Sequence, residues 1–92
     1  MEITFDPVKR EKTLEERGLD FVDAATVFEG ITIEQVDDRF DYGEVRMLTV
    51  GFLVDRMVVV IWTLRGTARH VISMRKANDR EQKKYQTRLG RS

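Results

Sequence analysis

Side chains that can bind a phosphate group or transfer a proton gather in the last third of the sequence. His70 is the only histidine, and because its ordinary pKa lies near neutrality, its ring can give or take a proton. Arg75 and Lys76 are adjacent cations, and such a pair can bind a phosphate. Tyr85 offers a ring that can stack on a base and a hydroxyl that can bond to a phosphate. We predict that these four residues form a catalytic group.

Further cations are predicted to bind phosphates: Lys9, Arg17, Arg65 and Arg69. The uneven distribution of charge supports this prediction. Residues 1–64 contain seven Lys/Arg and fourteen Asp/Glu, whereas residues 65–92 contain nine Lys/Arg and two Asp/Glu. The basic segment can attract phosphates and the acidic segment can meet a basic partner, although both can also be plain solvated surface.

Each catalytic candidate also has a structural interpretation. Regular alternation along a strand predicts one face with His70, Ile72 and Met74. It predicts the opposite face with Arg69, Val71, Ser73 and Arg75. His70 is then as readily a partly buried sheet residue as a catalytic one, and Arg75 a solvated strand end. Tyr85 stands one turn before Leu89, which is more typical of a docking residue.

We predict no metal and no cofactor. Asp37, Asp38 and Asp41 do not have the spacing of a metal-binding loop, and aspartate is common in turns. The sequence contains no phosphate-cradling glycine loop, zinc-protease motif or nucleophile elbow. Chemistry on a phosphate would therefore depend on side chains alone.

The length of 92 residues predicts a single domain over residues 1–92. The sequence has no cysteine, which excludes disulfides and thiolate metal sites and fits a reducing compartment. The first residues lack the basic stretch and apolar run of a secretory signal, and the apolar run over residues 57–62 is too short to span a bilayer. We expect a cytoplasmic protein without membrane contact.

The first elements follow from strand alternation and helix caps. Residues 1–5 predict a short strand. Asp6 and the proline after it open a helix that Gly18 closes, with Val8 and Leu14 as its apolar contacts. A second helix is predicted over residues 20–28, with a core-facing stripe of Phe21, Ala24, Ala25 and Phe28.

Four consecutive strands are predicted next, at residues 31–36, 45–53, 57–64 and 68–75. Their short links imply hairpins, and the apolar third strand should be central. Asn78 and Glu81 form a capping box that begins a final helix, which docks through Tyr85 and Leu89. The order β-α-α-β-β-β-β-α predicts an α+β fold with an antiparallel sheet of four to five strands.

Several motifs occur in an order that resembles a known family. They are Phe5-Asp6-Pro7-x-Lys9-Arg10, Leu14-x-x-Arg17-Gly18-x-x-Phe21, Asp37-Asp38-Arg39-x-Asp41-Tyr42-Gly43-Glu44-x-Arg46, and His70-Val71-Ile72-Ser73-Met74-Arg75-Lys76-Ala77-Asn78 followed by Arg80-Glu81 and Tyr85. In this order and spacing they resemble the BrnT toxins over nearly the whole chain.

The resemblance implies a RelE-like ribonuclease toxin of a type II toxin–antitoxin system, which inhibits translation. It implies a BrnA-like ribbon-helix-helix antitoxin, a two-plus-two complex, and operon repression in which operator DNA is contacted only through the antitoxin. Metal-independent RNA cleavage needs a proton acceptor for the ribose 2′-OH, a proton donor and cations around phosphorus. The alternative is a non-catalytic module that binds nucleic acid or an antitoxin.

The sequence departs from the family at possible site positions. The first helix of relatives often reads Lys-x-x-x-Asn-x-x-x-His, whereas Lys9, Thr13 and Arg17 occupy these positions here. His70 stands where relatives often have an arginine. Where only a basic group is needed, Arg17 and His70 can substitute.

Overall fold

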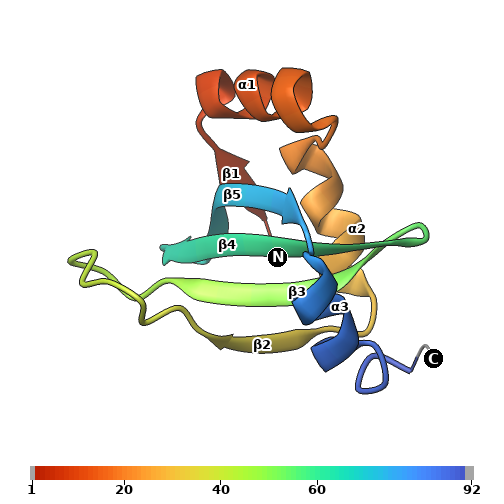
Figure 1. Cartoon of the computed structure of the whole chain (residues 1–92). Coiled ribbons are helices and arrows are strands. Elements are labelled where there is room, and N and C mark those ends of the chain that lie inside the picture. Colours follow the sequence, from red (N-terminus) through yellow and green to blue (C-terminus); the bar gives the residue numbers. More distant parts are fainter. Residues whose placement is uncertain (1, 91–92) are drawn as a thin grey trace.

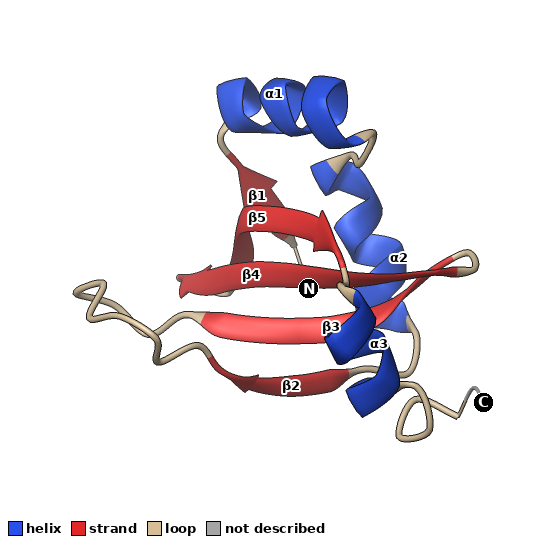
Figure 2. Cartoon of the chain, viewed as in Figure 1, coloured by secondary structure: helices blue, strands red, loops and turns tan. Residues whose placement is uncertain are grey.

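The computed structural model describes residues 2–90 and has an α+β fold (Figures 1 and 2). Its elements are β1 (Ile3–Phe5), α1 (Pro7–Arg17), the 3₁₀ turn η1 (Phe21–Asp23), α2 (Ala24–Glu29), β2 (Ile33–Val36), β3 (Met47–Leu53), β4 (Arg56–Arg65), β5 (Ala68–Lys76) and α3 (Asp79–Tyr85). The predicted order of strands and helices is confirmed. Met1, the start of the predicted first strand, lies outside the described residues.

The five strands form one mixed sheet in the order β1-β5-β4-β3-β2. Antiparallel pairing of β2 through β5 is confirmed, and β4 is the central strand as predicted. The prediction of a purely antiparallel sheet is wrong at one edge, because β1 pairs with β5 in parallel. Only strands joined by a hairpin must run antiparallel, and the chain between β1 and β5 comprises most of the molecule.

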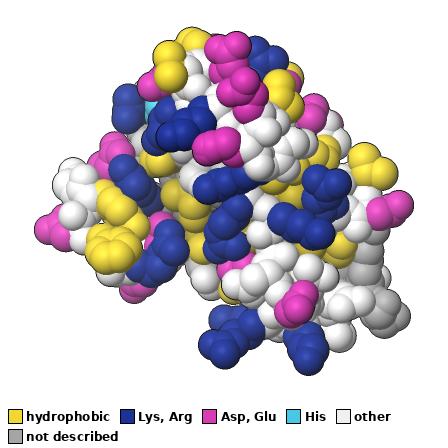
Figure 3. Space-filling model, turned by 45° about the horizontal axis from the view of Figure 1, so that its top comes forward, with side chains coloured by type: hydrophobic (Ala, Val, Ile, Leu, Met, Phe, Trp, Pro, Cys, Tyr) yellow, Lys and Arg dark blue, Asp and Glu magenta, His cyan; other side chains and the backbone are white. Residues whose placement is uncertain are grey.

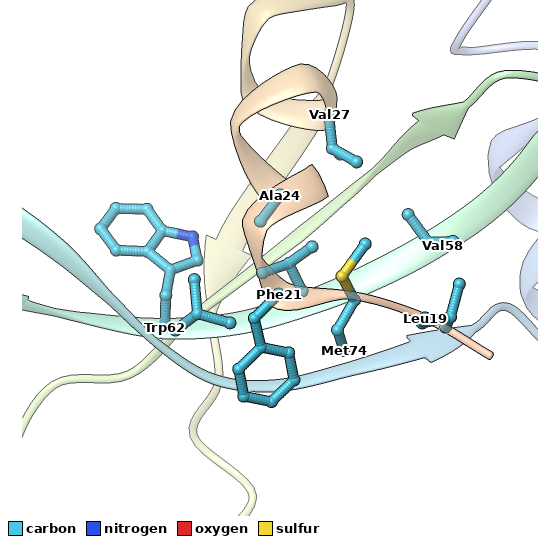
Figure 4. Packing of buried hydrophobic residues seen from close by; sticks show 9 residues of the cluster. Leu19, Phe21, Ala24, Val27, Val58, Trp62 and Met74 are labelled. Atoms are coloured by element: carbon cyan, nitrogen blue, oxygen red, sulfur yellow. The ribbon is translucent and has the colours of Figure 1, made fainter. Parts of the chain in front are cut away.

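Helices cover the two faces of the sheet unequally, with α2 behind it and α3 in front of its right-hand part in Figure 1. The core under η1 and α2 includes Leu19, Phe21, Ala24, Val27, Val58, Trp62 and Met74 (Figure 4). The predicted stripe is wrong at Ala25, which is exposed, while Val27 is fully buried. Because η1 begins the segment with three residues per turn, Phe21, Ala24 and Val27 align at spacings of three.

Helix α1 lies on the surface with no buried residue. Its caps are as predicted: the Asp6 side chain accepts from the Val8 N–H, and Gly18 has φ +68°. The prediction of Val8 as an apolar contact is wrong, since its side chain is 74% exposed. Arg10 instead fixes the helix through a two-pronged ion pair with Asp20 at 2.8 and 3.0 Å. No helix among residues 2–90 is long and apolar enough to cross a membrane.

Candidate functional site

A β-bulge in β5 decides which side chains share a face of the sheet. Trp62 pairs with Val71, whereas the preceding residue of β4, Ile61, pairs with Ser73. Ile72 is therefore an extra residue in β5, where two residues oppose one residue of β4. Beyond this point the side chains of β5 alternate in the opposite sense.

The bulge brings His70 and Arg75 to the same face. Val71 and Met74 stand three apart, yet both pack in the core under α2. His70 and Arg75 consequently lie on the opposite face, which also carries α3. The predicted alternation is wrong, because it separated these two residues and grouped Arg75 with Arg69.

His70 is held by the strand at the sheet edge. Parallel pairing sets Thr4 opposite His70, and Thr4 Oγ1 lies 2.8 Å from Nδ1 of the ring. Burial lowers the pKa of His70 below its ordinary value, and the positive charges of Arg65 and Lys9 lower it further. The ring is thus neutral at neutral pH and can accept a proton.

Arg75 has a carboxylate partner on α3. Its Nη1 and Nη2 donate to the two carboxylate oxygens of Glu81 at 2.7 and 2.9 Å. This hydrogen-bonded pair raises the pKa of Arg75 and lowers the pKa of Glu81. Glu81 also accepts from the N–H of Asn78, which confirms the predicted capping box. The pair therefore ties the start of α3 to the end of β5.

Two arginines between β2 and β3 were not selected from the sequence. Asp37 is buried, and its carboxylate accepts from Arg39 Nε and Nη2 at 2.7 and 2.9 Å. The charge of Arg39 also acts on the Arg75–Glu81 pair. Arg46 lies over the ring of Tyr42, 3.9 Å from its centroid. Both arginines belong to the central motif that resembles the BrnT toxins, and this motif could have identified them from the sequence.

Three predicted residues lie away from His70. Arg69 is on the α2 face, over the rings of Phe28 and Trp62 at 4.1 and 4.8 Å. Lys76 lines a cavity beside the β3–β4 hairpin. Tyr85 is only 4% exposed and its hydroxyl accepts from Gln35 at 3.4 Å. This burial agrees with the interpretation of Tyr85 as a residue that docks the final helix, and Leu89 is equally buried.

Of the remaining predicted cations, Arg65 and Lys9 act on His70, whereas Arg17 lies near the other end of β5. Arg65 is 57% exposed, with a distant Glu44 carboxylate at 3.9 Å. Lys9 and Arg17 line a groove between α1 and β5, together with Thr13 and Ser73 among others. Arg17 also donates from Nη1 to the carbonyl of Met74 at 3.0 Å, so part of its hydrogen-bonding capacity is structural.

Lys and Arg side chains form a band across the face of the molecule seen in Figure 3. Five residues of strand cover roughly 15 Å, so His70 and Arg75 cannot act on the same phosphorus atom. They can contact neighbouring phosphates of one strand. Among residues 2–90, no group of three His, Asp or Glu side chains is arranged to hold a metal ion. The face is suited to proton transfer by His70 and to phosphate binding by cations.

One comparison with known proteins places the chain in a family. A family model described as "Ribonuclease toxin, BrnT, of type II toxin-antitoxin system" matches residues 5–81. No curated protein shows a significant match to the chain. The matched segment runs from the last residue of β1 to the start of α3, and it includes His70, Arg75 and Glu81 but not Thr4.

Proposed function

Because the chain belongs to the BrnT family of ribonuclease toxins of type II toxin–antitoxin systems, we propose that it is a metal-independent endoribonuclease that inhibits translation in the cytoplasm. We also propose that residues 1–92 form one RelE-like domain. The observation that carries the proposal is the His70 ring, whose Nδ1 lies 2.8 Å from Thr4 Oγ1 and whose pKa is lowered by burial and by the charges of Arg65 and Lys9.

In the proposed reaction, the ribose 2′-oxygen forms a bond to phosphorus and the bond from phosphorus to the 5′-oxygen breaks. Nε2 of His70 takes the 2′-OH proton, while its Nδ1–H donates to the hydroxyl of Thr4. The Lys9 ammonium protonates the leaving 5′-oxygen, and Arg65 stabilises the negative charge on the phosphoryl oxygens. The products are a 2′,3′-cyclic phosphate and a 5′-hydroxyl.

Arg75 is assigned a binding role at a neighbouring phosphate. Its guanidinium has N–H groups beyond the two that Glu81 accepts, and its side chain is 31% exposed. Arg17 extends the cationic surface along the groove beside α1. Lys76 and Tyr85 have no role in the proposed reaction, because one lines a different cavity and the other is buried.

The test is RNA cleavage by the purified protein in the presence of EDTA. We expect cleavage to persist, to leave a cyclic phosphate, and to stop when the 2′-OH at the cleavage site is removed. His70→Gln and Arg65→Ala should each abolish or strongly reduce it. Arg56→Ala, which removes an exposed cation at the β3–β4 hairpin, is the matched control and should retain activity.

Two outcomes of this test would refute parts of the proposal. Activity that EDTA removes and added metal restores would refute metal independence. A folded wild-type protein that binds RNA but cleaves none, with or without ribosomes, would instead support a non-catalytic nucleic-acid-binding module.

A type II system implies an antitoxin protein as partner. We propose a BrnA-like ribbon-helix-helix antitoxin that covers the cationic face, with two toxins and two antitoxins in the complex. Operon repression would follow from DNA binding by the antitoxin. The toxin would contact the antitoxin and not the DNA. Light scattering of the co-expressed complex should give a mass that fits two copies of each chain, and a mass that fits a single toxin would refute the stoichiometry.

A further inference from the structure

We infer that Phe40, with Arg39 and Arg46, forms a nucleobase-binding site for single-stranded RNA in the segment between β2 and β3, residues 37–46, and that the ring of Phe40 stacks on a base beside the cleaved bond. This inference rests on the proposed ribonuclease function and adds a determinant of substrate binding to it. It is separate from the proton-transfer residues, none of which lies in this segment.

Phe40 is exposed and yet held in a defined orientation. Its side chain is 70% exposed, although phenylalanine is normally among the most buried residues. The ring meets that of Tyr42 edge to face, with centroids 5.8 Å apart and an interplanar angle of 75°. A ring fixed in this way loses little conformational freedom when a flat partner stacks on it.

The charges next to this ring are those that suit RNA. Arg39 is fixed by the buried carboxylate of Asp37, while its own side chain remains 56% exposed. Arg46 covers one face of the Tyr42 ring at 3.9 Å from the centroid, whereas the Phe40 side chain is 70% exposed. An exposed aromatic ring that follows Arg39 in the chain and contacts the ring under Arg46 offers a surface for a base together with cations for phosphates.

The segment also borders both ends of the proposed site. Near one end, Glu44 lies 3.9 Å from Arg65 and its charge acts on His70. Near the other end, Arg39 acts electrostatically on Arg75 and Glu81. Figure 3 shows a hydrophobic cluster at the left edge of the face, directly beside Lys and Arg side chains. A strand of RNA bound along β5 would therefore pass this segment.

The experiment measures both RNA binding and cleavage. The probe for binding is a short single-stranded RNA with 2′-O-methyl riboses, which the proposed mechanism cannot cleave, followed by fluorescence anisotropy. The variants are Phe40→Ala, Phe40→Leu and Phe40→Trp. Val45→Ala is the matched control, because Val45 is a 67% exposed apolar residue of the same segment.

We expect Phe40→Ala to weaken RNA binding by about five-fold to more than one hundred-fold, the usual range for the loss of one stacked base. Phe40→Leu should be nearly as weak because it retains apolar area without a ring, and Phe40→Trp and Val45→Ala should bind like the wild type. The preferred cleavage positions should also change in Phe40→Ala, since stacking determines which base lies beside the bond.

Two results would overturn the inference without affecting the proposed function. One is wild-type RNA affinity and cleavage pattern in Phe40→Ala. The other is an unchanged RNA affinity combined with weaker binding of the antitoxin, which would make Phe40 a protein-docking residue. Failure of the proposed function is distinguishable, because the wild-type protein itself would then cleave no RNA.

Discussion

Replacing Thr4 with valine tests whether His70 is a catalytic base. Nε2 of His70 can accept a proton only in the tautomer in which Nδ1 carries the hydrogen, and in that tautomer Nδ1–H donates to Thr4 Oγ1, 2.8 Å away. Valine has nearly the same shape as threonine but cannot accept this hydrogen bond. The net value of one hydrogen bond is about 0.5–1.5 kcal/mol, so kcat/KM for RNA cleavage should fall about two- to thirteen-fold.

A double-mutant cycle identifies the origin of this loss. Cleavage is measured for the wild type, Thr4→Val, His70→Gln and the double variant, with urea unfolding of each as the stability control. His70→Gln should lower kcat/KM by about one hundred-fold or more, and Thr4→Val should have no further effect in that background. Thr4→Ser retains the hydroxyl and should retain activity. An equal effect of Thr4→Val with and without His70 would refute positioning through the ring.

The pH dependence of cleavage provides an independent readout of His70. Because burial lowers the pKa of His70 below 6.5, the ring stays neutral from neutrality down to that pH. The activity of the wild type should therefore be retained near neutrality and fall only below pH 6.5, as the base becomes protonated. A loss of activity centred above pH 7 would contradict the assignment.

Further predictions concern stability and are measured by urea unfolding, followed through the fluorescence of Trp62, the only tryptophan. Thr49→Val should cost about 1–3 kcal/mol, because it leaves the Trp62 Nε1–H, which donates to Thr49 Oγ1 at 2.7 Å, buried without an acceptor. Gly51→Ala should cost about 1–3 kcal/mol, since a Cβ atom there would lie 2.9 Å from Val27 Cγ1. The same substitution should cost less in a Val27→Ala background, which lacks that methyl group. The hydrogen bonds from Arg39 lower the pKa of the Asp37 carboxyl. The ionised carboxylate therefore stabilises the fold at a pH above the unfolded-state pKa of Asp37, and this stabilisation is lost as the pH falls through the folded-state pKa. Asp37→Asn should thus be less stable than the wild type at pH 7, with a difference that shrinks in acid.

Features determined by neighbouring residues could be predicted from the sequence. The caps at Asp6 and Gly18 involve groups within one helical turn, and so does the capping box of Asn78 and Glu81. Hairpins between β3, β4 and β5 follow from short links between apolar runs. Such signals need no knowledge of the rest of the fold, because the interacting groups are fixed relative to each other by local geometry.

Features that depend on distant contacts could not be predicted in this way. The bulge at Ile72 depends on the register between β4 and β5, and regular alternation therefore wrongly separated His70 from Arg75. The hydrogen bond from Thr4 to His70 exists only because β1 pairs with β5. Arg39 stands in an acidic turn, and its guanidinium acts on Arg75 only because the folded sheet brings the two segments together.

The pairing of β1 with β5 has a consequence for the timing of toxicity during synthesis. The contact between Thr4 and His70 closes a loop of 66 positions, and contacts of such long sequence separation form slowly because of their entropic cost. While residues 69–71 are still inside the ribosome, β1 has no partner strand and the ring of His70 has no hydroxyl beside it. If His70 is the proton acceptor, as proposed, a nascent chain cannot cleave RNA until its synthesis is nearly finished, and the antitoxin can bind it before that point.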